Sequence, residues 1–229
     1  MSRFQTTRWN LIQDARDHPS RSRAALEQLC RAYRPPVLAF IRHSGHGASD
    51  AEDLTQAFFL RFLESGWYAD ATPERGRFRS LLLTSVRHFL SDQHAQAAAR
   101  KRGGGIAHCG NDAIEQLAGG ESPEEAFTRA WLGTVVSHAM ARLHDEWTQA
   151  GKQEQFRQLS SMLVEHPDAQ ELHVLAEKTG MRANTLAVQA HRMRQRLRQL
   201  VRLELLQTVG SREALELELA ELRGGLPPP

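Results

Sequence analysis

Apolar residues recur every three or four positions through most of this chain, and this spacing constrains the fold more than any other feature. It places apolar side chains on one face of an α-helix, because a helix completes a turn in about 3.6 residues. The clearest stripe consists of Leu186, Ala190, Met193, Leu197 and Leu200. Valine and isoleucine are sparse, and no Asn-Gly or Asp-Gly hairpin signal occurs. The sequence therefore predicts an all-α fold.

The same spacing divides the chain into helices that proline and glycine separate. Pro35 and Pro36 should break or kink the first helix, because proline lacks the N–H donor and its ring crowds the preceding turn. Gly151 could divide the fourth helical segment, and Gly180 divides the fifth into two short helices. We expect helical segments over residues 23–43, 49–65, 78–102, 127–165, 171–205 and 211–223.

A glycine-rich stretch, residues 103–126, forms the natural boundary between two parts of the chain. Glycine favours a flexible linker, and the Ser-Pro-Glu-Glu sequence at its end is typical of a helix start. We predict two helical lobes joined by this flexible linker, with the first lobe at 1–102 and the second at 127–205. Residues 206–229 would form an acidic helical extension.

The net charge of +2 conceals a strong segregation of charge along the chain. Residues 1–102 hold 16 Lys and Arg against 10 Asp and Glu, and residues 171–203 hold 7 against 2. Residues 103–170 hold 4 against 10, and residues 204–229 hold 2 against 5. Two basic blocks around an acidic stretch indicate two regions that contact phosphate. The alternative is that the arginines only form solvent-exposed helix faces and contact no phosphate.

The sequence argues against several other classes of protein. No run of about 18 apolar residues occurs, so we expect no membrane-spanning helix. The charged N-terminus has no apolar core and does not resemble a secretory signal. Cys30 and Cys109 make no disulfide framework, which favours the reducing cytoplasm. No four-ligand metal set, P-loop or G-x-S-x-G motif occurs, so we expect no metal, no cofactor and no enzymatic activity.

Residues 175–202, LAEKTGMRANTLAVQAHRMRQRLRQLVR, have the pattern of a helix-turn-helix. Gly180 can adopt the positive φ that a tight turn between helices needs. Arg182 lies at the start of the second helix, where free backbone N–H groups favour phosphate. The face opposite the apolar stripe could read base edges in a major groove, and it carries Asn184, Thr185, Val188, Gln189, Arg192 and Arg196. A plain helical hairpin with a solvated arginine face is the alternative.

This segment resembles region 4 of the extracytoplasmic-function (ECF) group of bacterial RNA polymerase sigma factors. The resemblance lies in Leu175-Ala176-Glu177, Gly180-Met181, Thr185-Leu186, His191-Arg192, Arg194 and Arg196-Leu197-Arg198. In that group, the second helix binds the −35 promoter element. This chain departs from the pattern at Ala187 and Gln189, where the group often has Lys and Arg, and in the longer segment that precedes the motif.

The first lobe resembles region 2 of the same group in AALEQLCRAYRPPVLAFIR, DAEDLTQAFFLRFLE and PERGRFRSLLLTSVRHFLSD. The resemblance implies that the helix with the DAED tetrad docks on the basic clamp helices of the polymerase β′ subunit. Its candidate contacts are Asp50, Glu52, Asp53 and Gln56. Ser49 and Glu52 also fit a capping box at the helix start. On the same helix, we expect Leu54, Phe58 and Phe62 to face the core.

The loop at residues 65–78 is where, by the same resemblance, a base of the −10 element is flipped out and held. Trp67 and Tyr68 are the candidate walls of this pocket, although they could equally cap the core of the lobe. The further candidate contacts to −10 DNA are Arg75, Arg77, Arg79, Arg87, Ser91, Arg100, Lys101 and Arg102.

Two regulatory hypotheses arise from charge. The first is control by a Ser/Thr kinase through Thr55, which lies one turn after the acidic residues. A phosphate group there would add negative charge to a face that binds a basic partner. The acidic segment 204–229 could restrain the basic C-terminal lobe or bind a regulator.

Together these observations lead us to expect an ECF-type alternative sigma factor. Its partners would be core RNA polymerase, through the β′ clamp helices and the β flap, promoter DNA, and an anti-sigma factor or a kinase. Two alternatives stay open. One is a stand-alone helix-turn-helix regulator, which needs no acidic face, and the other is a sigma-mimicking protein that sequesters an anti-sigma factor and needs no basic DNA face.

Overall fold

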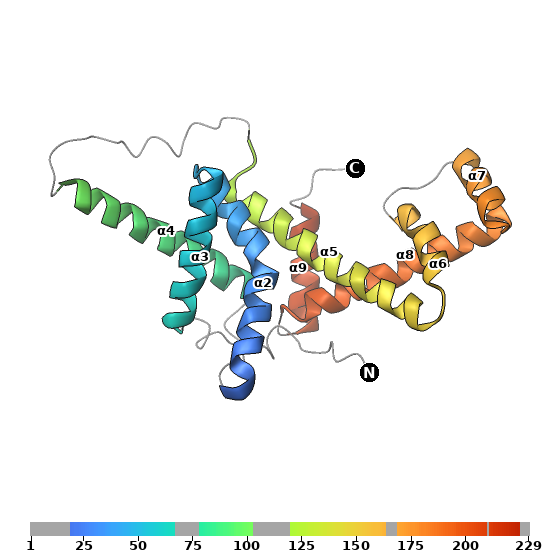
Figure 1. Cartoon of the computed structure of the whole chain (residues 1–229), viewed down its shortest axis with the longest axis horizontal. Coiled ribbons are helices and arrows are strands. Elements are labelled where there is room, and N and C mark those ends of the chain that lie inside the picture. Colours follow the sequence, from blue (N-terminus) through green and yellow to red (C-terminus); the bar gives the residue numbers. More distant parts are fainter. Residues whose placement is uncertain (1–18, 67–77, 103–119, 164–168, 210, 225–229) are drawn as a thin grey trace. The chain divides into compact units, whose positions relative to one another are not determined.

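A computed structural model describes residues 19–66, 78–102, 120–163, 169–209 and 211–224 (Figure 1). Within these ranges the regular structure is helical and contains no strand, which confirms the all-α prediction. The elements are α2 (Pro19–His43), α3 (Ala48–Glu64), α4 (Phe78–Arg102), α5 (Pro123–Gln149), α6 (Gln153–Leu159), the short 3₁₀ helix η3 (Ser160–Leu163), α7 (Ala169–Thr179), α8 (Ala183–Leu206) and α9 (Arg212–Gly224).

The helix bounds follow the predicted segments closely, with two differences. Helix α2 continues through Pro35 and Pro36, so the pair does not break the helix, and the kink that was the other predicted outcome stays a prediction. Tyr33, Val37 and Phe40 are buried on either side of this pair, and their packing outweighs the backbone hydrogen bonds that the prolines remove. Two helices flank Gly180 as expected, but the second of them, α8, has 24 residues and is longer than the short helix predicted there.

The chain forms two compact units. Unit 1 comprises Met1–Thr134 together with Leu206–Pro229, and unit 2 comprises Val135–Leu205. The chain passes from unit 1 to unit 2 inside α5 and returns to unit 1 at the last residue of α8. This division differs from the predicted lobes, which ended the first lobe at residue 102 and left 206–229 as a separate extension.

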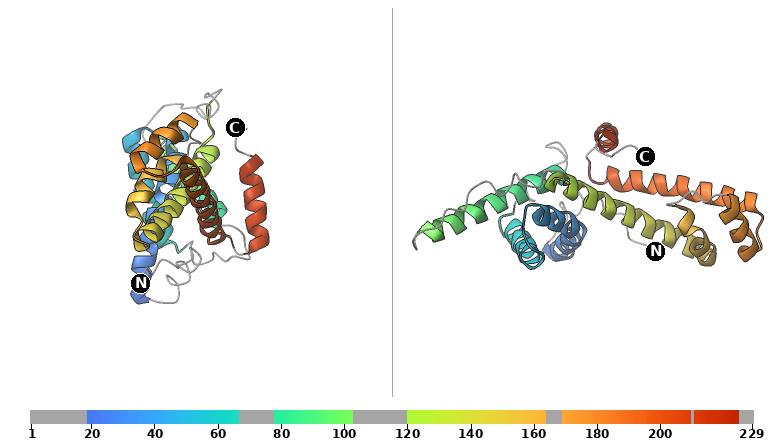
Figure 2. Two further views of the ribbon diagram at one scale, coloured as in Figure 1. Left: turned by 90° about the vertical axis from the view of Figure 1, so that its right-hand side faces the viewer. Right: turned by 90° about the horizontal axis from the view of Figure 1, so that it is seen from above.

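The core of unit 1 is built largely from aromatic side chains. Helices α2 and α3 lie side by side, as the right-hand view of Figure 2 shows. Tyr33 of α2 meets Phe78 of α4 edge to face at 5.0 Å between ring centroids, and Phe58 of α3 meets Phe89 of α4 at 5.6 Å. Such contacts add about 0.5–1.5 kcal/mol per pair beyond the burial of apolar area. Trp131 of α5 is also completely buried.

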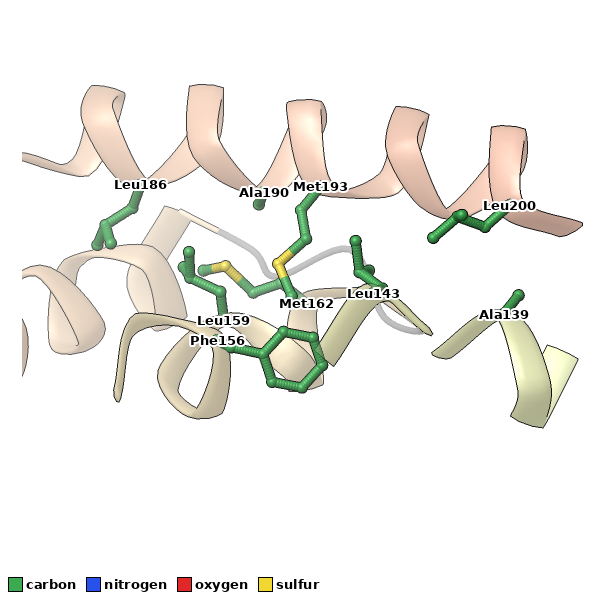
Figure 3. Packing of buried hydrophobic residues seen from close by; sticks show 9 residues of the cluster. All are labelled: Ala139, Leu143, Phe156, Leu159, Met162, Leu186, Ala190, Met193 and Leu200. Atoms are coloured by element: carbon green, nitrogen blue, oxygen red, sulfur yellow. The ribbon is translucent and has the colours of Figure 1, made fainter. Parts of the chain in front are cut away.

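The core of unit 2 forms around the stripe predicted on α8. Leu186, Ala190, Met193 and Leu200 are buried, and Leu197 packs against the cluster while partly exposed. Figure 3 shows the four buried side chains of α8 directed toward those of α5, α6 and η3. The opposing side chains are Ala139, Leu143, Phe156, Leu159 and Met162. The stripe thus fixes which face of α8 is left for a partner.

Gly180 makes the turn between α7 and α8 with a φ of +66°. A Cβ atom added there would meet no atom within 4 Å, so a substitution tests the backbone conformation alone. Gly180→Ala should lower the free energy of unfolding of unit 2 by about 1–2 kcal/mol, because alanine avoids the left-handed region. Gly180→Asn should cost less, since asparagine tolerates that region. Urea unfolding would measure both variants, and an alanine variant as stable as the original chain would contradict the expectation.

Candidate functional site

The start of α3 is held by a contact with α2, and not by the predicted capping box. Gly47 is the N-cap residue, in an extended conformation, and it makes no side-chain cap hydrogen bond. The Glu52 carboxylate instead pairs with Arg34 and lies 3.6 Å from the Arg42 guanidinium, both on α2. Two guanidinium groups outweigh one backbone N–H as partners for a carboxylate. The capping-box prediction is therefore wrong, and Glu52 joins α3 to α2.

The outer face of α3 combines acidic and apolar groups. Asp50, Asp53 and Gln56 are exposed, and Leu60 continues the same side of the helix with 60% of its surface exposed. Their spacing of three and four residues keeps these side chains together. Within the described ranges, neither aspartate forms an ion pair. We call this set of four residues the α3 outer face.

The buried face of α3 carries Ala51, Thr55, Phe58 and Phe62, with Leu54 only partly buried beside it. The Thr55 side chain is 1% exposed, and its hydroxyl donates to the carbonyl oxygen of Ala51 at 2.6 Å. A kinase needs an accessible hydroxyl, so this burial contradicts the prediction of phosphorylation at Thr55. The buried hydroxyl is tolerated at this position because its hydrogen bond is made within its own helix.

Arg79, a predicted contact to −10 DNA, is occupied within unit 1. Its side chain is 13% exposed and forms an ion pair of 2.9 Å with Glu218 of α9. It also donates to the Thr128 hydroxyl at 3.1 Å, and its guanidinium lies over the Trp131 ring, 5.0 Å from the centroid. Arg79 is therefore covered in this arrangement, and its contact with −10 DNA stays a prediction.

The remaining −10 candidates divide into described and undescribed residues. Arg87 donates two hydrogen bonds, of 2.6 and 3.0 Å, to one carboxylate oxygen of Glu124 on α5, while its side chain stays half exposed. Ser91 is exposed on α4. The last turn of α4 contains Arg100, Lys101 and Arg102, whose side chains lie outside the description, and Trp67, Tyr68, Arg75 and Arg77 lie outside the described residues.

In unit 2, helix α8 presents most of the predicted recognition face to solvent. Arg182, Asn184, Thr185 and Arg192 are exposed, and Val188 is 50% exposed among them. Gln189 is only half exposed. These side chains lie opposite the buried stripe, in an arrangement that a major groove could accept.

Arg196 has a different place from the one predicted. It donates to both carboxylate oxygens of Glu146 on α5, at 2.7 and 2.8 Å. In a second ion pair, α5 supplies the guanidinium and α8 the carboxylate: Arg142 lies 2.8 Å from the buried Glu204. The two ion pairs hold α5 against α8 within unit 2. Arg196 is therefore paired with α5 while 42% of its side chain stays exposed, and its contact with −35 DNA stays a prediction.

The Glu146–Arg196 pair predicts a pH dependence for unit 2. The hydrogen bonds from Arg196 lower the pKa of the Glu146 carboxyl below its usual value. A lowered folded-state pKa adds stability above the unfolded-state value, and this contribution is lost as the pH falls through the folded-state value. Glu146→Gln should therefore melt at a lower temperature than the original chain near pH 7. The difference should shrink below about pH 4, and thermal melts over this pH range would show a constant difference if the pair contributes nothing.

The described residues include one free cysteine but no metal-binding cluster. Burial raises the pKa of the Cys30 thiol to about 11, which keeps this thiol protonated and unreactive. No group of three or more His, Cys, Asp or Glu residues there could hold a metal ion. Among the described helices, none has the length and apolar character needed to cross a membrane.

Helices α2, α3 and α4 together coincide with a known domain type. Residues 29–100 match the family model of Sigma-70 region 2. The match runs from within α2 almost to the end of α4 and supports the sigma-70 family of RNA polymerase sigma factors. It thus supports a role in promoter recognition by RNA polymerase. No curated protein and no solved structure gave a match.

Sequence reasoning missed the residues around Arg79 in this sigma-70 region 2 segment. Glu218 lies on the buried side of α9, between Leu215 and Leu222. The signal that could have revealed the contact is a glutamate on the same helix face as two leucines. Such a glutamate would be buried, and a buried carboxylate needs a charged partner. The partner could not be chosen from the sequence, which offers many arginines.

Proposed function

We propose that the chain is an ECF-type alternative sigma factor that binds core RNA polymerase and directs −10 melting and transcription initiation. The observation that carries the proposal is the sigma-70 region 2 match over α2–α4, on a segment whose α3 outer face is acidic and open. The polymerase supplies the chemistry, and this chain supplies docking and promoter selection. Such a role would place it in the cytoplasm with the polymerase.

Docking on the β′ clamp helices would use the α3 outer face. Asp50 and Asp53 offer carboxylates to a basic partner, Gln56 offers hydrogen bonds, and Leu60 offers apolar area. Glu52 takes an indirect part, because its contacts with α2 hold the helix that presents the other residues. The charge pattern supports a partner of opposite sign.

Recognition of the −35 element would use the exposed face of α8. Arg182 is placed for a backbone phosphate, Asn184 and Arg192 can donate to base edges, and Val188 can contact a thymine methyl group. Arg196 and Glu146 would fix the angle at which the helix is presented. In the −10 region, Trp67, Tyr68, Arg75 and Arg77 stay candidates by resemblance.

In vitro transcription with purified core polymerase and a library of genomic promoter fragments would test the proposal. We expect initiation that depends on this chain at a common set of −10 and −35 sequences. Sequence-specific duplex binding without any effect on the polymerase would favour the stand-alone helix-turn-helix regulator. Tight binding of an anti-sigma factor without DNA-directed initiation would favour the sigma mimic.

A further inference from the structure

We propose that α9 competes with promoter DNA for Arg79 within the same chain. The Glu218 carboxylate would bind the Arg79 guanidinium until nucleic acid displaces the helix. This inference rests on the proposed function, because it assigns Arg79 to DNA contact during initiation. It adds a built-in restraint to that function. The acidic C-terminal segment would restrain the first unit of the chain, and not the helix-turn-helix that charge alone suggested.

The contact engages the Arg79 guanidinium from several sides. Nη2 lies 2.9 Å from a carboxylate oxygen of Glu218 and 3.8 Å from one of Glu221. Nη1 donates to the Thr128 hydroxyl, and the planar group lies over the Trp131 ring. Carboxylate, hydroxyl and aromatic face are the partners that a guanidinium prefers. A phosphate group could reach Arg79 only after the carboxylates had left.

Glu218 is unusual for a residue at the centre of a packed helix face. It is 1% exposed, and the buried residues one turn to either side are Leu215 and Leu222. A leucine at 218 would complete an apolar stripe, and apolar replacement of a buried ion pair is often neutral or stabilising. Packing therefore does not require a carboxylate there. The carboxylate makes attachment of α9 depend on Arg79, so that another anion on Arg79 weakens the attachment.

Phosphate is the anion best able to replace this carboxylate. The guanidinium fork binds either group with similar geometry. Arg79 lies in the first turn of α4, and this first turn contains no acidic residue. The positive end of the helix dipole there favours an anion. Helix α9 also carries Glu213, Glu216 and Glu221, which repel phosphate while the helix is in place. Displacement of α9 would remove both obstacles.

The full-length chain with Glu218→Gln tests the competition, because the change keeps the shape of the side chain and removes its charge. The probe is a short fluorescent single strand of random DNA sequence, with binding measured by anisotropy at several salt concentrations. We expect about tenfold tighter binding, the scale of one hydrogen bond to a charged group. The slope of log affinity against log salt should steepen by about 0.7 for each phosphate gained.

Glu216→Gln is the matched control, since it removes the same charge from an exposed position on the same helix. Its affinity should stay within about twofold of the original chain, because exposed charges are screened. The double variant Arg79→Gln with Glu218→Gln should lose the gain. Equal gains from Glu216→Gln and Glu218→Gln, or a gain that persists without Arg79, would overturn the inference.

Hydrogen exchange of the original chain gives a second measurement that needs no variant. Addition of the same DNA should speed exchange of the α9 amides and leave those of α6, which has no part in the proposed DNA contacts, unchanged. Unchanged or stronger protection of α9 in the DNA-bound chain would overturn the inference while the proposed function stands, provided that DNA-directed initiation is seen. If the chain supports no initiation and binds neither DNA nor core polymerase, the proposed function fails together with the inference.

Discussion

Replacing Asp50 and Asp53 together by lysine should abolish binding to core RNA polymerase while the chain keeps its helical content. Both side chains are exposed on the α3 outer face, so the fold does not need their charge. Against a basic partner, each reversal exchanges an attraction for a repulsion, and like charges across an interface cost several kcal/mol. Biolayer interferometry with immobilised core enzyme would measure the affinity, and circular dichroism would measure the helical content.

A matched control for this experiment is available in unit 2. Asp145 and Glu177 are also exposed helical carboxylates, and their reversal to lysine makes the same change in net charge away from α3. This control should bind core polymerase with nearly the original affinity. If the Asp50/Asp53 variant binds as tightly as the control, the α3 outer face is not the docking surface.

Truncation of Phe58 to alanine should have the largest effect on stability. Phe58 is completely buried and meets Phe59, Phe62 and Phe89 with ring centroids 5.2 to 5.7 Å apart. Phenylalanine-to-alanine changes in a core cost about 3–5 kcal/mol, because they leave a cavity as well as removing buried area. Domains are stable by about 5–15 kcal/mol, so unit 1 would come close to unfolding. Denaturant unfolding of both proteins would measure the loss.

Leu60→Ala on the same helix separates stability from docking. Leu60 is the exposed apolar residue of the α3 outer face, so its truncation should change the free energy of unfolding by no more than about 0.5 kcal/mol. It should nevertheless weaken binding to core polymerase. A loss of stability in Leu60→Ala similar to that in Phe58→Ala would mean that the two faces of α3 have been assigned incorrectly.

The helices of this protein could be predicted because their signals are local. Phe78, Leu82, Val86 and Phe89 repeat with the helical period, all four are buried, and the predicted bounds of α4 coincide with the observed ones. The apolar stripe on α8 could be predicted for the same reason. The prolines of α2 failed as a predicted break because long-range packing decided the outcome there.

The partners of the arginines could not be predicted, because they depend on which helices meet. In the sequence, Arg79, Arg87 and Arg196 stand in basic, helical stretches like those of exposed arginines. In the structure, each is paired with a glutamate on another helix. Nothing local distinguishes them from Arg192, which is exposed on α8. A basic stretch therefore indicates affinity for phosphate without telling which guanidinium groups are free to provide it.

The return of the chain to unit 1 after Leu205 has a consequence for biosynthesis. A ribosome makes a protein from its N-terminus, and domains tend to fold as they emerge. The residues of α2, α3 and α4 leave the ribosome well before the helix that carries Glu218. A nascent chain would thus expose Arg79 without its carboxylate partner until α9 has been made, and the restraint would form only from then on.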